Sequence, residues 1–321
     1  MSERYSRQIL LKEIGKEGQE LISQKKVAIL GMGALGTVSA ELLTRAGVGS
    51  LLLIDRDVVE ESNLQRQTLF TEKDLRKSKA ITAKTKLQEI NSTIKIEAEA
   101  IHLNSENIDL LNDADLILDC TDNLKTRFLL NDYCKKNKKP WVYSAAIKTS
   151  GYVMPILPEG PCLMCFLKEA NLETCDTSGV LNTLTTSIAS LQTTKAIKII
   201  LGKETESLLY HYDIWNEEFK KLKIRPREGC ETCQGKYVYL DNSNNSNNKP
   251  IRFCSAGKYQ IGGPVKDFAA LIKTWRELGK VKSDGATLQF QNIMLFKDGR
   301  ALIKANSEEE AQAVYSKFIG N

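Results

Sequence analysis

Several features that define large classes of protein are scarce or missing in this sequence. Histidine occurs twice in 321 residues, at His102 and His211, which leaves little room for histidine-ligated metals. The formal net charge is +5, and no basic run is interleaved with aromatic residues, so a nucleic-acid partner is not indicated. No apolar stretch approaches the roughly 20 residues of a membrane span, and the N-terminus has no apolar signal core. We therefore expect a cytoplasmic protein that binds neither nucleic acid nor membranes.

Cysteine is the exception to this scarcity, with eight residues. Without an export signal, cysteines are expected to be reduced thiols or metal ligands rather than disulfides. Cys162-x-x-Cys165 and Cys230-x-x-Cys233 have the spacing of a closed tetrathiolate zinc site, which is structural because it keeps no open position for catalysis. The alternative is four unmetallated surface thiols.

Short apolar runs alternate with segments of helical spacing through the first half of the chain. The pattern predicts strands near residues 27–30, 51–54, 94–98, 116–120 and 141–144, with helices over 4–24, 34–46 and 77–90. Strands that alternate with helices predict a Rossmann-like, doubly wound α/β fold with a mostly parallel sheet.

An Asn/Ser tract at 241–250 has nothing to bury and predicts a linker. It would divide a larger domain (1–240) from a small α+β domain (251–321). In the smaller part, the sequence predicts a helix over 265–278 and two strands within 288–305 around Lys297-Asp298-Gly299. A last helix is expected to start at Ser307.

The predicted first strand runs directly into a glycine-rich turn, formed by Gly31, Gly33 and Gly36. Such a turn places backbone N–H groups at a helix N-terminus, where they favour phosphate oxygens. Asp55 lies 19 residues after Gly36, the offset at which an acidic residue meets a ribose hydroxyl in such folds. By itself this motif fits an NAD-dependent oxidoreductase as well as an ATP-binding enzyme.

Charged residues follow the predicted strand ends. Arg66, Lys79 and Asp122 should lie where ligands bind in open α/β sheets. Two cations and a carboxylate at one place could clamp a triphosphate and its Mg²⁺, a clamp that a nicotinamide cofactor does not need. Taken singly, Arg66 and Lys79 are better read as solvated surface charges, and Asp122 as a simple turn residue.

As a set, these motifs resemble the ThiF/MoeB/HesA adenylyltransferases, which are related to ubiquitin-activating enzymes. The resemblance covers about residues 1–236 and is carried by Arg4-Tyr-Ser-Arg7-Gln, the glycine turn, Asp55 to Asp57, Asn63-Leu-Gln-Arg66-Gln, Lys79, Cys120-Thr-Asp122-Asn and both cysteine pairs. It implies ATP-dependent adenylation of the C-terminal glycine of a small ubiquitin-like sulfur carrier ending in Gly-Gly, with release of pyrophosphate.

The resemblance also implies a role for each matching residue. Asp55 is expected to hold the ribose, Asn63, Arg66 and Lys79 to bind the phosphates, and Asp122 to bind Mg²⁺. Arg7 is expected to reach into the nucleotide pocket of a partner subunit, which requires a homodimer. The alternative for Arg7 is a local ion pair.

Cys175 resembles the crossover-loop cysteine that some family members use covalently. Glu173 and Asp176 beside it argue against an activated thiolate, because they tend to raise a thiol pKa. An enzyme that activates a ubiquitin-like modifier through a thioester at Cys175 therefore stays an alternative, as does a non-enzymatic scaffold. A sulfurtransferase or cysteine desulfurase is a further expected partner. The region around Cys254 resembles, more weakly, the tail of thiazole-pathway members, and its task is left open.

Overall fold

The computed structural model describes residues 3–167, 178–204, 206–241, 251–252 and 258–320. Its contacts divide the chain into two units, Met1–Ser243 and Asn244–Asn321. Within the described residues, no helix is both long and apolar enough to cross a membrane.

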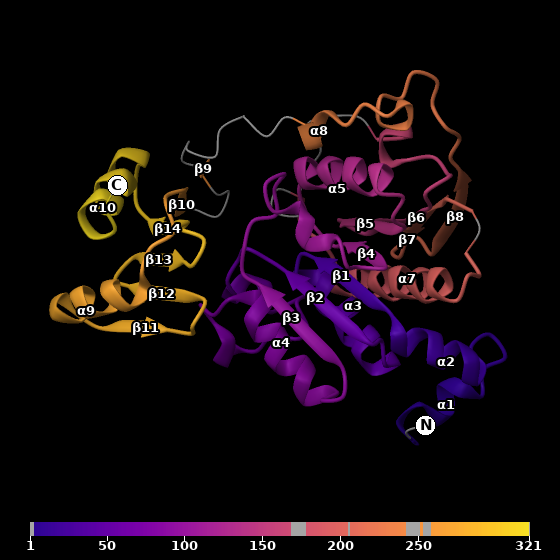
Figure 1. Ribbon diagram of the computed structural model, residues 1–321, viewed down its shortest axis with the longest axis horizontal. Helices are drawn as coiled ribbons and strands as arrows, with labels where there is room; N and C mark the ends of the chain where they lie inside the picture. Colours follow the sequence, from indigo (N-terminus) through magenta and orange to yellow (C-terminus); the bar gives the residue numbers. More distant parts are fainter. Residues whose placement is uncertain (1–2, 168–177, 205, 242–250, 253–257, 321) are drawn as a thin grey trace. The chain divides into compact units, whose positions relative to one another are not determined.

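An eight-stranded sheet forms the centre of the first unit (Figure 1). Its order is β3-β2-β1-β4-β5-β6-β7-β8. The pairs from β3 to β5 are parallel, and those from β5 to β8 are antiparallel. The strands are β1 (Lys26–Leu30), β2 (Ser50–Ile54), β3 (Lys95–Glu99), β4 (Leu116–Asp119), β5 (Trp141–Ile147), β6 (Ser150–Ile156), β7 (Leu208–Asp213) and β8 (Glu218–Lys223). The predicted Rossmann-like, mostly parallel sheet is confirmed, and the three antiparallel strands add to it.

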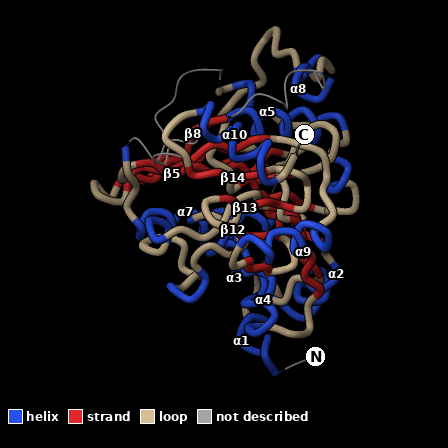
Figure 2. The backbone as a smooth tube through the Cα atoms, turned by 90° about the vertical axis from the view of Figure 1, so that its left-hand side faces the viewer, coloured by secondary structure: helices blue, strands red, loops and turns tan. Residues whose placement is uncertain are grey.

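Helices cover both faces of this sheet because its central strands are apolar on both sides. On β1, Val27 and Ile29 join one hydrophobic core, while Ala28 and Leu30 join the other. The first core is covered by α2 (Gly15–Gln24), α3 (Ala34–Ala46), α4 (Lys79–Ile90) and α7 (Asn182–Ile200). The second is covered by α5 (Leu124–Lys136) with the short α8 (Val238–Asp241). Figures 1 and 2 show α5 and α7 on opposite sides of the strands.

The N-terminal segment does not form the single helix expected over residues 4–24. It consists of a 3-10 turn η1 (Glu3–Tyr5), a one-turn α1 (Ser6–Ile9) and α2. Gly15 has a φ of +65°, a left-handed conformation that interrupts a continuous helix. The helical pattern was right in type, but the apolar spacing carried no signal for this break.

The second unit has a six-stranded antiparallel sheet of order β11-β12-β13-β14-β10-β9 and two helices. Its strands are β9 (Ile251–Arg252), β10 (Lys258–Ile261), β11 (Val281–Ser283), β12 (Thr287–Phe290), β13 (Ile293–Phe296) and β14 (Ala301–Lys304), with α9 (Phe268–Leu278) and α10 (Glu308–Phe318). Ser307 caps α10 as predicted, since its Oγ accepts from the Glu310 N–H at 3.2 Å.

One prediction for this unit was wrong. Residues 288–305 contain three strands rather than two, because the chain also turns between β12 and β13. Gln291 makes that turn with a φ of +51°. Neither glycine nor proline marks the position, and Asn292 is the one ordinary turn residue there.

Candidate active site and cysteine cluster

The glycine turn between β1 and α3 is packed tightly on its protein side. Gly31 has a φ of +89°, and a Cβ there would lie 2.6 Å from the Cys120 carbonyl oxygen. A Cβ at Gly36 would overlap the carbonyl oxygen of Gly31. These two positions therefore require glycine for the fold itself.

Gly33 differs from both neighbours in the motif. The nearest atom to a Cβ on Gly33 would be the Gln67 side-chain nitrogen, at 3.8 Å. Gly33 is also the N-cap of the 13-residue helix α3, which no side chain of the described residues caps. The turn thus leaves open space beside uncapped N–H groups at a helix N-terminus, an arrangement that suits an anionic phosphate.

Asp55 follows β2 and ties that strand end to the glycine turn. Its buried carboxylate accepts from the Met32 N–H at 2.5 Å and from the Asp57 N–H at 2.6 Å. Burial raises the pKa of Asp55, and the charge of Lys79 and the two backbone N–H groups counteract that rise. Asp55 therefore orients the turn directly, a contribution that sequence reasoning did not foresee beside its expected contact with ribose.

Lys79 begins α4 and faces a group of carboxylates. Its side chain is 9% exposed, and its Nζ lies 3.7 Å from Asp57 Oδ2. Burial opposes the charge of Lys79, but Asp57, Asp55, Asp122 and Glu60 together outweigh burial and raise its pKa. The structure thus places Lys79 within the electrostatic influence of Asp55, Asp57 and Asp122.

Asn63 and Arg66 occupy the segment between β2 and α4. Asn63 ends a 3-10 turn, η2 (Glu61–Asn63), where its Oδ1 accepts from the Glu60 N–H at 3.2 Å. The Arg66 guanidinium donates to the Ser62 carbonyl at 2.9 Å. Both residues are partly exposed, so their polar groups remain accessible to a ligand.

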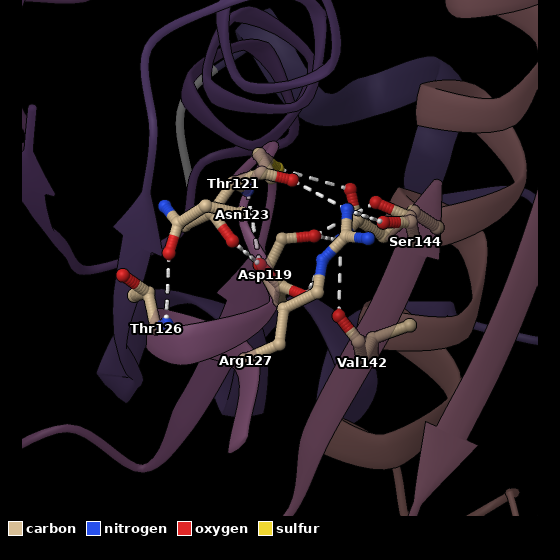
Figure 3. Close-up of polar contacts among 9 residues, drawn as sticks. Asp119, Thr121, Asn123, Thr126, Arg127, Val142 and Ser144 are labelled. Atoms are coloured by element: carbon tan, nitrogen blue, oxygen red, sulfur yellow. Dashed lines mark hydrogen bonds and ion pairs between the residues drawn. The ribbon is translucent and has the colours of Figure 1, made fainter. Parts of the chain in front are cut away.

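The loop that carries Asp122 rests on a buried ion pair (Figure 3). Arg127 Nε lies 3.2 Å from Asp119 Oδ2, and the two side chains are 9% and 0% exposed. Arg127 also donates to the carbonyls of Thr121 and Ser144, while the Thr121 hydroxyl donates to Asp119 at 2.6 Å. These contacts hold the loop in place, and the side chain of Asp122 is exposed.

Asp119 and Arg127 were not identified from the sequence as contributors to this site. Burial raises the pKa of Asp119, and the charge of Arg127 opposes that rise. A possible signal was an acidic residue at the end of an otherwise apolar strand, with an arginine in the first turns of the following helix.

The remaining predicted site residues lie apart from this group or outside the described residues. Arg7 is exposed on α1, which is compatible with an intermolecular contact and with a local one. Cys175 and Cys254 both fall outside the described residues.

The fold brings together the two cysteine pairs that the sequence separates by 64 residues. The four Sγ atoms of Cys162, Cys165, Cys230 and Cys233 all lie within 4.8 Å of one another. Three of these separations are 3.5, 3.6 and 3.9 Å. A disulfide needs about 2.05 Å, whereas tetrahedral Zn²⁺ with bonds of about 2.3 Å holds its sulfurs roughly 3.8 Å apart. The cluster thus fits a zinc ion.

The match to known proteins agrees with this geometry. The sequence model of the ThiF family matches residues 5–232. This range contains the glycine turn, the charged group formed by Asp55, Asp57, Lys79 and Asp122, and three of the four clustered cysteines. The chain belongs to the ThiF family. Members of this family use ATP as adenylyltransferases, so family membership disfavours the oxidoreductase alternative.

Two curated relatives extend the comparison. The Bacillus subtilis (strain 168) sulfur carrier protein ThiS adenylyltransferase is 36% identical over 100% of both chains. The SAMP-activating enzyme E1 of Haloferax volcanii is 34% identical over 72% of this chain and 88% of its own. The similarity to the ThiF-family chain from B. subtilis therefore includes the second unit.

A solved structure shows the same fold. E. coli MccB, crystallised with ATP, superimposes with a TM-score of 0.65 over 73% of this chain and 74% of its own, at 23% identity. At that identity the likeness supports the fold alone.

Proposed function

We propose that this ThiF-family protein adenylates the C-terminal glycine carboxylate of a small ubiquitin-like sulfur carrier ending in Gly-Gly. The observation that carries the proposal is that Asp55 joins the glycine turn to the charges around Lys79. Asp55 accepts from the Met32 N–H, and the charges of Asp55 and Asp122 both act on Lys79. The full-length similarity to a ThiS adenylyltransferase supports the choice of carrier.

In the proposed reaction, a carboxylate oxygen of the carrier attacks the α-phosphorus of ATP. The bond from that phosphorus to the bridging oxygen breaks, and pyrophosphate leaves with the electron pair. Asp55 holds the ribose, while Asn63, Arg66 and Lys79 neutralise the charge that builds on the leaving group. Asp122 would hold a Mg²⁺ ion, which when bound would screen the same charge.

Two further parts of the proposal concern assembly. Arg7 acts in the nucleotide pocket of the partner subunit of a homodimer, and the cysteine cluster holds a structural zinc ion. The adenylated carrier then receives sulfur from a sulfurtransferase or cysteine desulfurase in the cytoplasm, for thiamine, molybdopterin or tRNA thiolation.

A second candidate is activation of a ubiquitin-like modifier through a thioester at Cys175. It is favoured by the name of the H. volcanii relative, an E1 enzyme. Both candidates share the adenylation step, and they differ in whether Cys175 becomes acylated. Cys175→Ser separates them. If the second candidate is right, wild type forms a thioester with the modifier and Cys175→Ser does not, whereas pyrophosphate exchange stays unchanged in either case.

The test is ATP–pyrophosphate exchange by the full-length protein with a panel of small carriers ending in Gly-Gly. We expect exchange that depends on one carrier and is abolished by Asp122→Ala. Asp113→Ala, which removes an exposed carboxylate before β4, is the matched control and should leave the rate unchanged. Absence of exchange with every carrier, from folded protein that binds ATP, would overturn the proposal.

A further inference from the structure

We propose that a single turn of helix α5 positions both cysteine pairs for their metal ion, through Asn131, Asp132 and Lys135. This assignment concerns residues that neither the glycine turn nor the charged group uses. It explains how two short turns far apart in the sequence come to present four sulfurs at metal-binding distances.

Asn131 and Lys135 hold the first pair. The Asn131 side-chain oxygen accepts from the N–H of Leu163, which lies between the two cysteines, at 2.8 Å. Lys135 Nζ donates to the carbonyls of Pro158 and Gly160, at 2.6 and 3.1 Å, just before Cys162. Residues four apart lie on one face of a helix, so this face contacts the chain both before and inside the first pair.

Asp132 holds the second pair from the adjacent face. One carboxylate oxygen accepts from the hydroxyl of Thr232, between Cys230 and Cys233, at 2.7 Å. The other accepts from the Tyr239 N–H at 2.9 Å. Phe128, one turn earlier on α5, packs its ring 5.0 Å from that of Tyr239. The second pair is therefore fixed to α5 both between its two cysteines and beyond its C-terminal end.

Asn131 and Asp132 of α5, and Thr232 in the second pair, are buried. Asn131 and Asp132 are 0% exposed, and Thr232 is 3% exposed. The two cysteine turns, η5 (Leu163–Cys165) and η6 (Thr232–Gln234), are 3-10 turns of three residues each. Such short turns gain little order from their own hydrogen bonds, so their orientation depends on what they pack against.

Positioning of this kind affects metal binding through the cost of ordering the ligands. If α5 holds both pairs in place, little conformational entropy is lost when the metal binds. Hydrogen-bonding partners beyond the ligands typically change metal affinity by about 10- to 100-fold. Loss of the Asp132 contacts should therefore free the second pair and accelerate metal release.

The experiment measures zinc release from the full-length protein to a chromogenic chelator. Wild type is expected to hold one zinc ion per chain and to release it slowly. Asp132→Ala and Asn131→Ala should each accelerate release by about 10-fold or more. Asp132→Asn should release zinc at nearly the wild-type rate, because its oxygen can accept from Tyr239 and its NH₂ can donate to the Thr232 hydroxyl.

Tyr133→Phe is the matched control, since it removes a hydrogen bond from the same turn of α5, to Asn112 at 2.8 Å, away from both cysteine pairs. It should leave the release rate unchanged. If Asp132→Ala fails to fold, Thr232→Val tests the same contact from the other partner. Wild-type release rates in all of these variants, equal acceleration by Tyr133→Phe, or no zinc in the wild type would each overturn the proposal.

Discussion

The first unit contains two sites that are built in different ways. The glycine turn and the charged residues Asp55, Lys79 and Asp122 each lie just after a strand or at the start of a helix in the parallel half of the sheet. The cysteine cluster draws on two turns separated by 64 residues, and both turns are anchored to helix α5. In the first site the strand order supplies the convergence, and in the second the packing of one helix does.

Helix α5 links the two constructions. Its first turn carries Arg127, which supports the loop of Asp122, and residues 131–135 further along the helix hold the cysteines. The charged group depends on α5 for the position of the one loop that carries Asp122, whereas both turns of the cysteine cluster are anchored to this helix. For the first unit we expect four outcomes, of which the largest effect comes first.

Arg127→Ala should have the largest effect, on stability. The change leaves the carboxylate of Asp119, which is 0% exposed, without its cation. Removal of one partner of a buried pair typically costs about 3–5 kcal/mol, and urea unfolding measures this loss. Arg45→Ala is the control, because Arg45 is 58% exposed and its pair with Glu41 should be worth at most about 0.5 kcal/mol. A loss no larger than the control's would show that Asp119 does not need Arg127.

Lys79→Met should act on the reaction instead. Loss of a cation that stabilises developing charge typically lowers a rate by about 100-fold or more, and pyrophosphate exchange measures it. Lys77→Met is the control from the same segment, since Lys77 is 48% exposed and pairs with Asp74 at 3.3 Å. An equal loss of exchange in Lys77→Met would show that the phosphate contact is not specific to Lys79.

Asp74→Asn should have a smaller effect that depends on pH. Burial opposes ionisation of Asp74, but hydrogen bonds from Lys86, Thr71 and Lys77 lower its pKa to about 2. The pKa of Asp74 is thus lower in the folded protein than in the unfolded one. The ionised carboxylate therefore contributes its full stabilisation of the fold above about pH 4, and this contribution is lost as the pH falls toward about 2. We expect the variant to be less stable by roughly 1–2 kcal/mol at neutral pH.

Urea unfolding at several pH values checks this expectation. The difference between Asp74→Asn and wild type should narrow as the pH falls through that range. If the difference in the free energy of unfolding stays constant down to about pH 2, it comes from packing and not from the charge of Asp74.

Truncation after Asp241 should have the smallest effect. The first unit has both hydrophobic cores, the charged group and the cysteine cluster within its own residues. A unit with its own core generally folds alone, so carrier-dependent exchange should stay within about twofold of the full-length rate. Loss of exchange in a folded truncated protein would give the second unit a part in the reaction.

Much of the parallel half of the sheet was predictable, because apolar runs bounded by glycines and acidic residues mark buried strands. Helix α3 (Ala34–Ala46) has the predicted bounds, with Gly47 in a left-handed conformation at its end. Strands β6 to β8 were not identified, and β8 is exposed along its whole length and has no buried face to reveal it. The turn at Gln291 was also missed, since Asn292 is the one turn residue that marks it and neither glycine nor proline is present.

The sequence by itself determined the family-like motif set, the alternation of strands and helices, and the cysteine spacing that suits a metal. These are local properties, carried by residues within a few positions of one another. Only the tertiary structure decided that Asp55 binds the glycine turn, that Arg127 pairs with Asp119, and that α5 holds both cysteine pairs. Those contacts join residues distant in sequence, or different elements, and burial of shared apolar surface rather than local pattern brings them together.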